Sequence, residues 1–401
     1  MKSRIKVYMG WALLLVIMVL CYGLALANSQ SLIGQEQSCM LYKKADFLNG
    51  KEAFALQERN KEIEDPFSFT LWGSKKKQEI CFQEYGRKKN AEVLLICGNS
   101  NLLFPTGPYL GISDEESCLL SGDLAYELFG SRDVKGQKIC YGRKEYTIKG
   151  ILEQVKQTMV VQADNKTEAI MDAAALRIPK GRLASLAASD FEQLYGVADL
   201  KLNLNAVLSW GRFFVSLLPL CMTFLLAGAA VKRIISFRQV PIQCFVLSAV
   251  VILFILFCLW LGECGQGLSF PFAPSKWSDF QYWKEAFQEL GRGFWNFIVI
   301  EKREPERIII ENLLSTVKYM CFSILVFLLF IRKIKPVSEW NVLFYCSICI
   351  GTAFLAVLGS GADARNIVES TSLWLLPSVF VAAAFFLNKC YSLCGSKKVN
   401  G

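Results

Sequence analysis

Residues 118–153 read CLLSGDLAYELFGSRDVKGQKICYGRKEYTIKGILE, and this stretch decides the fold of the segment around it. Apolar residues recur at helical spacing over 123–129, and Gly130 follows them as a helix stop. Two strand-like segments within 137–152 flank the turn dipeptide Gly142-Arg143. The stretch therefore predicts a short helix followed by a β-hairpin.

The sequence on either side predicts further strands and one more helix. Residues 79–85 alternate between apolar and polar side chains, as a half-buried strand does. Residues 92–97 form a short apolar run that ends at Gly98, which is typical of a buried strand. Residues 168–175 fit a helix, and 176–179 fit a closing strand. Together these segments predict a domain of the α+β class.

Apolar residues elsewhere are gathered into six runs. They cover residues 8–28, 213–231, 242–261, 313–331, 340–358 and 370–387. Such runs are long enough to cross a hydrocarbon core of ~30 Å, and in lipid the backbone satisfies its polar groups only as a helix. For the first run a cleaved signal peptide is the alternative, because ALANS resembles a cleavage site. The chain is predicted to be a polytopic α-helical membrane protein.

The runs divide the chain into six parts. We expect an N-terminal membrane helix at 1–28, an extracytoplasmic core domain at 29–212, membrane helices two and three at 213–261, an extracytoplasmic loop at 262–312, membrane helices four to six at 313–388 and a basic tail at 389–401. In the loop, aromatic and leucine side chains recur at helical spacing between Phe280 and Leu290. This pattern is typical of a helix in the membrane interface, and packing against the core domain is the alternative.

The basic residues indicate the orientation. The N-terminus, the turns after the second and fourth runs and the tail hold twelve Lys and Arg against one acid, Glu339. With six crossings, all four segments fall on one side. The positive-inside rule then places both termini in the cytoplasm of a multi-pass cell-membrane protein. This accounts for the net charge of +9 without a nucleic-acid partner.

The composition excludes several chemistries. The chain is 53% hydrophobic and has no histidine, so catalytic arrangements that need an imidazole are absent. No G-x-x-x-x-G-K-[ST] motif occurs, so any ATP hydrolysis belongs to a partner chain. We expect no catalytic residues, no cofactor, no metal site and no enzymatic activity.

Six cysteines fall on the predicted outer side, where disulfides persist. They are Cys39, Cys81, Cys97, Cys118, Cys140 and Cys264. Six cysteines allow 15 pairings, and the sequence does not choose among them.

The stretch 118–153 resembles the MacB-like periplasmic core domain of ABC transporter permeases of the MacB/FtsX type. The matching features are a helix ending in Leu-Phe-Gly, a glycine turn and a glycine after the last strand. In this chain Ala125, Leu128, Phe129, Gly130, Gly136 and Gly150 stand in those places. The resemblance covers about residues 67–179, whereas the membrane half diverges, since the family's usual unit has four membrane helices.

The resemblance implies a permease-type subunit that couples a separate cytoplasmic ATPase to its extracytoplasmic domain, as a homodimer or beside a second permease. The candidate coupling segment lies after the second apolar run and contains Lys232, Arg233, Ile234, Ile235, Phe237 and Arg238. Its apolar residues lie between cations, and such a cluster can dock in a groove. The alternative is a non-transporting, membrane-anchored binding or signalling protein that retains a MacB-like ectodomain.

Overall fold

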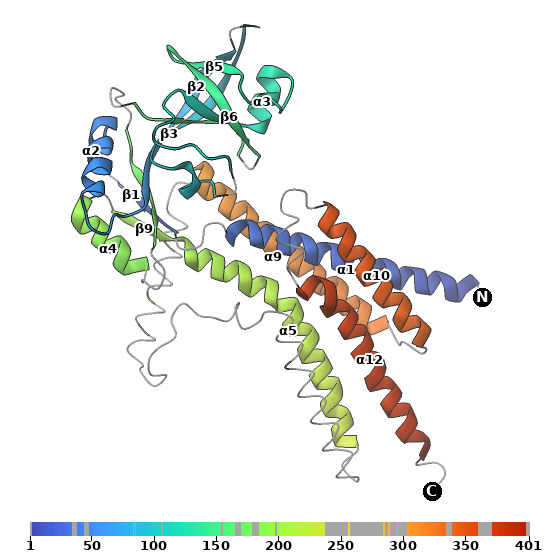
Figure 1. Cartoon of the computed structure of the whole chain (residues 1–401). Coiled ribbons are helices and arrows are strands. Elements are labelled where there is room, and N and C mark those ends of the chain that lie inside the picture. The colour runs from blue at the N-terminus through green and yellow to red at the C-terminus, as the bar shows by residue number, and fades with distance from the viewer. Residues whose placement is uncertain are drawn as a thin grey trace. The chain divides into compact units, whose positions relative to one another are not determined.

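The structure is a computed structural model that describes most of the chain (Figure 1). The described residues are 2–33, 38–43, 48–164 except Gln83, Tyr85, Thr106 and Gln154, then 170–178, 184–196, 199–236, 303–333, 339–359 and 371–397, with the single positions Leu256, Lys284, Gln288 and Trp295.

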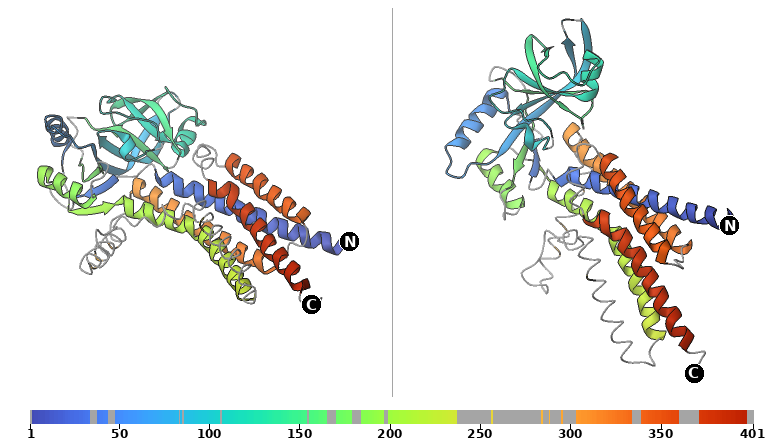
Figure 2. Two further views of the ribbon diagram at one scale, coloured as in Figure 1. Left: turned by 60° about the horizontal axis from the view of Figure 1, so that its bottom comes forward. Right: turned by 45° about the vertical axis from the view of Figure 1, so that its right-hand side comes forward.

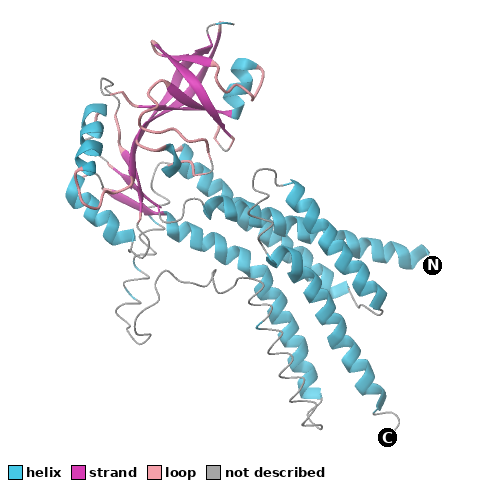
Figure 3. Ribbon diagram, in the orientation of Figure 1, coloured by secondary structure: helices cyan, strands magenta, loops and turns pink. Residues whose placement is uncertain are grey.

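The chain divides into two units. One, the helical unit, comprises Met1–Ile33, Leu208–Ala273 and Asn312–Gly401. The other, the α/β unit, comprises Gly34–Val207 and Pro274–Glu311. Within the described residues, strands occur only in the α/β unit (Figure 3).

The α/β unit is built on a mixed nine-stranded sheet in the order β3-β7-β4-β6-β5-β2-β8-β1-β9. The strands are β1 (Ser38–Tyr42), β2 (Phe69–Phe82), β3 (Arg87–Cys97), β4 (Ser117–Ser121), β5 (Lys138–Tyr141), β6 (Lys144–Leu152), β7 (Thr158–Gln162), β8 (Ala173–Arg177) and β9 (Leu200–Asn203). An additional β2–β3 pairing closes six strands into a ring, and β8, β1 and β9 extend the sheet from β2. The long β2 therefore belongs to both parts.

Each part of the sheet has its own apolar core. Inside the ring, α3 (Gly122–Phe129) buries Leu124, Ala125 and Leu128 against strand residues such as Ile80. Beside the β8–β1–β9 part, α2 (Gly50–Lys61) and α4 (Ala184–Tyr195) contribute Ala53 and Phe191 to a second core (Figure 1). A capping box, made by Asn49 and Glu52, starts α2. A short 3-10 turn, η2 (Ser100–Leu102), follows β3.

The structure confirms most of the strands predicted in this unit and corrects one helix. The predicted hairpin is β5–β6, with Gly142 in its turn at φ 64°, and the buried run 92–97 ends β3. The helix predicted over 168–175 is wrong, because Ala173–Ala175 lie in β8, paired with β1 on one side and β2 on the other. Alanine is the best helix former, but burial between two strands overrides that weak preference.

The helical unit consists, as far as it is described, of five long helices. They are α1 (Lys2–Ile33), α5 (Leu204–Ser236), α9 (Glu304–Lys333), α10 (Glu339–Gly359) and α12 (Thr371–Lys397). The first turns of α5 and α9 belong to the α/β unit by the division above. Among the described residues, four segments are long and apolar enough to cross a membrane: Met9–Gln30, Trp210–Lys232, Glu304–Ile331 and Glu339–Gly359. In α12 the apolar part, Ser372–Phe386, is shorter.

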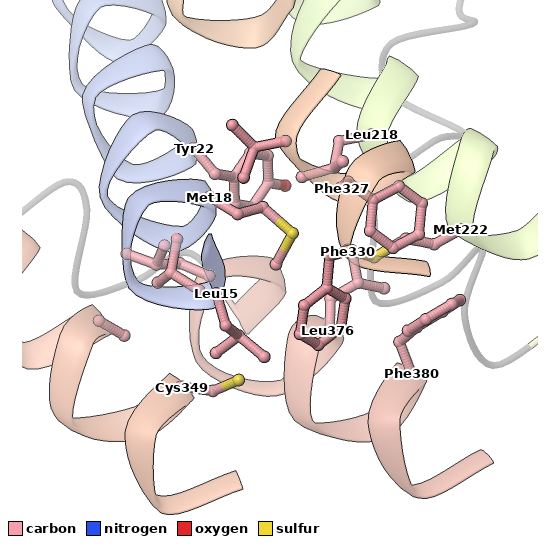
Figure 4. Close-up of a cluster of buried hydrophobic side chains, with 14 of the residues drawn as sticks. Leu15, Met18, Tyr22, Leu218, Met222, Phe327, Phe330, Cys349, Leu376 and Phe380 are labelled. Carbon is pink, nitrogen blue, oxygen red and sulfur yellow. The ribbon is translucent and has the colours of Figure 1, made fainter. Parts of the chain in front are cut away.

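The helices of this unit share one apolar core. Leu15 and Met18 of α1 meet Leu218 of α5, Phe327 of α9 and Leu376 of α12 there (Figure 4). Helix α1 also contacts α10 and α12, as both views of Figure 2 show. A Cβ on Gly23 of α1 would lie 2.8 Å from the Ala356 Cβ of α10, so this contact requires glycine.

Several predictions fall on residues that are not described. The third predicted span, 242–261, lies outside the described residues except for Leu256. Of the interfacial helix predicted in the loop 262–312, only Lys284 and Gln288 are described. The count of six spans therefore stays a prediction, and four candidate spans stand beside an α/β domain.

Candidate functional site

In one row of the sheet of the α/β unit, two large aromatic side chains lie on either side of an alanine. Ala173 of β8 is paired with Tyr42 of β1 on one side and with Trp72 of β2 on the other. Residues that are directly opposite each other point to the same face of a sheet. Tyr42 and Trp72 therefore flank an alanine, which leaves space between the two rings.

The start of α9 meets this row. Arg303 precedes the helix, and its carbonyl oxygen accepts the first helical bond from the Arg307 N–H at 2.9 Å. The Glu306 carboxylate accepts from the Arg303 backbone N–H at 3.0 Å, as the third residue of a capping box does. It also accepts from the Tyr42 hydroxyl. Glu306 thus caps its own helix and ties it to β1.

The Arg303 side chain makes the second connection. Its guanidinium lies over the Trp72 ring, 5.2 Å from the centroid. It also donates two hydrogen bonds to the Asp172 carboxylate, the first with an Nη1–Oδ1 distance of 2.5 Å. Such a bidentate pair is among the stronger charge-assisted interactions in proteins. We call Tyr42, Trp72, Asp172, Arg303 and Glu306 the Arg303 anchor.

Burial sets the electrostatics of this cluster. It raises the pKa of the Tyr42 hydroxyl well above its usual value, and the Glu306 carboxylate adds to the effect. Burial by itself lowers the pKa of Arg303, but the hydrogen bonds and charge of Asp172 more than offset it and raise that pKa overall. The tyrosine is therefore neutral and the arginine charged at neutral pH, so the anchor holds a fixed ion pair.

Glu304, the residue after Arg303, makes a second set of contacts. The Glu304 carboxylate accepts from the Lys156 backbone N–H at 3.4 Å and pairs with Arg307 at 2.9 Å. Acidic side chains in a first turn also favour the helix dipole. The first turns of α9 are thus bound to the sheet by polar contacts from three chain segments. The arrangement is suited to holding a helix in place.

The residues of the candidate coupling segment lie at the end of α5. Lys232 and Ile235 are exposed, Ile235 at 66%, and Val231 is 52% exposed. Arg233 and Ile234 lie in the helix, but their side chains are not described, and Phe237 and Arg238 lie outside the described residues. The structure therefore brings an exposed apolar pair and a cation together here.

The ectodomain motif gathers around α3. Ala125 and Leu128 are fully buried, and Gly130 ends the helix at φ 77°, which confirms it as the helix stop. Gly136 also has a positive φ of 85°, and a Cβ at Gly150 would lie 2.5 Å from Pro108.

One expectation for this motif needs correction. We expect Phe129 to be buried against the hairpin 137–152, but it is only partly buried. Its ring packs on Phe82 of β2, with centroids 4.2 Å apart. The last turn of α3 therefore packs against the end of β2.

The five described cysteines of the α/β unit are free thiols, and Cys264 lies outside the described residues. Three of them are enclosed in the sheet, and burial raises the pKa of each thiol to about 12: Cys39, Cys97 and Cys118. The other two, Cys81 and Cys140, face each other across β2 and β5. Among the described residues, no group of three or more acid and cysteine side chains is arranged to hold a metal.

The sequence analysis missed the Arg303 anchor. Its members come from four distant segments, and Asp172 and Arg303 are 131 positions apart in the chain. One local signal was present: Glu304-Pro305-Glu306 after Arg303 has the proline and the third-position glutamate of a helix start. As a helix start, this signal predicts that the helix of the fourth span begins upstream of residue 313.

Comparisons with known proteins give the following result. No family model matches the chain, and no curated protein matches it. A solved structure of the periplasmic region of MacB from Actinobacillus actinomycetemcomitans is similar at 11% identity and a TM-score of 0.35, covering 44% of this chain and 93% of that one.

Two further solved structures are similar over a comparable part. The extracellular domain of the noncanonic ABC-type transporter YknZ from Gram-positive bacteria matches at 12% identity and a TM-score of 0.31, covering 41% of this chain and 97% of that one. A domain of a putative permease from Porphyromonas gingivalis matches at 17% identity and a TM-score of 0.28, covering 40% and 85%. All three similarities extend over about two fifths of this chain.

Proposed function

We propose that the protein is a permease-type membrane subunit of an ABC system, which couples a separate cytoplasmic ATPase to its extracytoplasmic domain. The resemblance of residues 118–153 to the MacB-like core domain supports this, as does the order of one helix, then a domain, then further helices.

The observation that carries the proposal is the Arg303 anchor. Helix α9 runs without interruption from Glu304 to Lys333 and includes a candidate membrane span. Its first turn is fixed to β1, β2 and the residue before β8 by a bidentate ion pair and a cap. A helix held in this way transmits a displacement to the sheet better than a mobile loop does, and coupling requires such a connection.

The orientation belongs to the same proposal. The four basic segments lie in the cytoplasm, and the α/β unit lies outside. The exposed end of α5 then faces the cytoplasm, where Ile235, just past the candidate span, offers an apolar contact beside Lys232. Basic residues alone serve to attract anionic lipid, worth ~1 kcal/mol per charge. An exposed isoleucine among them adds an apolar contact that a protein partner can bind.

The experiment that tests the proposal is replacement of Ile235 by serine in the full chain. We expect Ile235→Ser to reduce co-purification of the ATPase and its stimulated hydrolysis, while insertion is unchanged. Phe224→Ser is the matched control, because Phe224 is exposed on the same helix three turns earlier and on the same face. If both variants behave as the wild type, the end of α5 is not the coupling element.

The second candidate is a non-transporting binding or signalling protein with the same ectodomain. One observation favours it: the segment from Lys232 to Pro241, between the second and third apolar runs, is short for docking an ATPase. The same purification separates the two. If no ATPase accompanies the wild type, the second candidate is the better account.

A further inference from the structure

Two of the outer cysteines lie opposite each other in the sheet. Strands β2 and β5 are antiparallel, and their register pairs Cys81 with Cys140. Directly opposite residues in such a pair have Cα atoms ~4.5 or ~5.5 Å apart, and both separations suit a disulfide. This pair needs no backbone rearrangement to become covalent.

The pair lies on the charged face of the sheet. Its strand neighbours Ile80 and Ile139 point into the ring core, so the two cysteines point the other way. Ion pairs lie on both sides, Lys88–Glu79 at 2.8 Å and Lys138–Glu145 at 3.2 Å. Cys81 is partly exposed, whereas Cys140 is buried. An external reagent therefore reaches Cys81 first.

The other three described cysteines of the α/β unit are not placed to form a disulfide across neighbouring strands. Cys39 is paired with Leu176 and Asn203, Cys97 with Leu71, and Cys118 with Ile148 and Val161. None of the three has a cysteine opposite it. Burial raises the pKa of each of these three thiols to about 12, which suppresses the thiolate that reacts. Burial also raises the pKa of the Cys140 thiol, so the partly exposed Cys81 is the thiol that reacts first.

We propose that Cys81 and Cys140 form a redox-controlled disulfide, with a disulfide of the thiol-oxidoreductase or glutathione class as the oxidant. The Cys81 thiolate attacks one sulfur of the oxidant, which forms a mixed disulfide and releases the first thiol. The Cys140 thiolate then attacks the Cys81 sulfur, which closes the intramolecular bond and releases the second thiol. The pair loses two electrons and two protons, and the oxidant gains both.

The bond links the shortest pairing of the ring. Within the described residues, strands β2 and β5 share two residue pairs, Ile80–Tyr141 and Cys81–Cys140. The β2–β3 pairing is far longer and extends from Leu71 to Phe82. A covalent link at the short pairing fixes the ring closed, and reduction frees it. The inference is independent of the proposed permease function.

The test uses the full chain in membranes, incubated with oxidised glutathione. Free thiols are then blocked with N-ethylmaleimide under denaturing conditions, and unreduced peptides are identified by mass spectrometry. We expect a linked Cys81–Cys140 peptide pair that Cys81→Ser abolishes and that the matched control Cys118→Ser retains. Cys140→Ser should instead accumulate a glutathione adduct on Cys81, which gives a second readout of the same pathway.

Two results overturn the proposal. One is recovery of both cysteines as maleimide adducts in the wild type after the incubation. The other is a link between Cys81 or Cys140 and a different cysteine.

Discussion

Removing the charge of Arg303 should release the first turns of α9 from the sheet. In Arg303→Gln the Asp172 carboxylate keeps its charge but loses its only described ion-pair partner, and the Trp72 ring loses its cation. The capping bond from the Arg303 backbone N–H to Glu306 does not depend on the side chain. The variant therefore separates the ion pair from the helix start.

The expected magnitude follows from the exposure of the pair. The side chains of Arg303 and Asp172 are 17% and 21% exposed. Breaking a fully buried ion pair costs about 3–5 kcal/mol, so this partly screened pair should cost roughly 2–4 kcal/mol. Since 1.4 kcal/mol is about a factor of ten, amides that exchange by opening of this contact should exchange about 30- to 1000-fold faster.

Hydrogen exchange of the full chain, followed by mass spectrometry, measures this effect. The peptides of interest cover residues 304–311 and 172–177. Lys88→Gln is the matched control, because Lys88 and Glu79 are 61% and 60% exposed and water screens such surface pairs. We expect local acceleration in Arg303→Gln and almost none in the control.

A double variant that removes both charges gives a further expectation. With Asp172→Asn added to Arg303→Gln, no charge is left unpaired. The acceleration of exchange in the double variant should therefore be smaller than the two single-variant effects combined. Exchange over 304–311 that is equally fast in Arg303→Gln and in Lys88→Gln would refute the anchor.

Three further outcomes are expected. Leu128→Ala should lower the unfolding free energy of the α/β unit by about 2–5 kcal/mol and Phe129→Ala by less, roughly 1–3 kcal/mol, because Phe129 is partly exposed; equal losses in urea unfolding would contradict this difference. Gly150→Ala should cost about 1–3 kcal/mol, because its Cβ would lie 2.5 Å from Pro108, and an unchanged urea midpoint would argue against that contact. The Cys118 thiol should resist iodoacetamide in the folded protein, since burial raises its pKa to about 12; rapid labelling seen by mass spectrometry would show that the site opens.

The sequence correctly predicted those elements that depend on residues close together in the chain. The hairpin 137–152 and the helix stop at Gly130 follow from turn residues, and the four candidate spans follow from apolar length. Strand β2 was predicted only from residue 79 onward. Its pattern is interrupted at Lys75–Lys77, where the strand is irregular in register and Lys77 has a φ of 56°.

The candidate site depends on contacts that no local pattern contains. Asp172 precedes the three alanines of β8, whose helix preference misled the prediction, and its partner lies 131 residues away. Tyr42 and Glu306 are separated by 264 residues. Only the fold brings these side chains together, so the anchor could be expected as a helix start but not as an ion pair. The pairing of Cys81 with Cys140 was hidden for the same reason.

The central claim is that the end of α5 contacts a cytoplasmic ATPase. A photo-crosslinking amino acid at position 235, in the full chain in its own membrane, tests it most directly, because Ile235 is exposed there. The account predicts a cross-link to a protein that carries a G-x-x-x-x-G-K-[ST] motif, identified by mass spectrometry, and no such cross-link from position 224 on the same helix. Capture of lipid alone from position 235, or capture of the same ATPase from both positions, would contradict it.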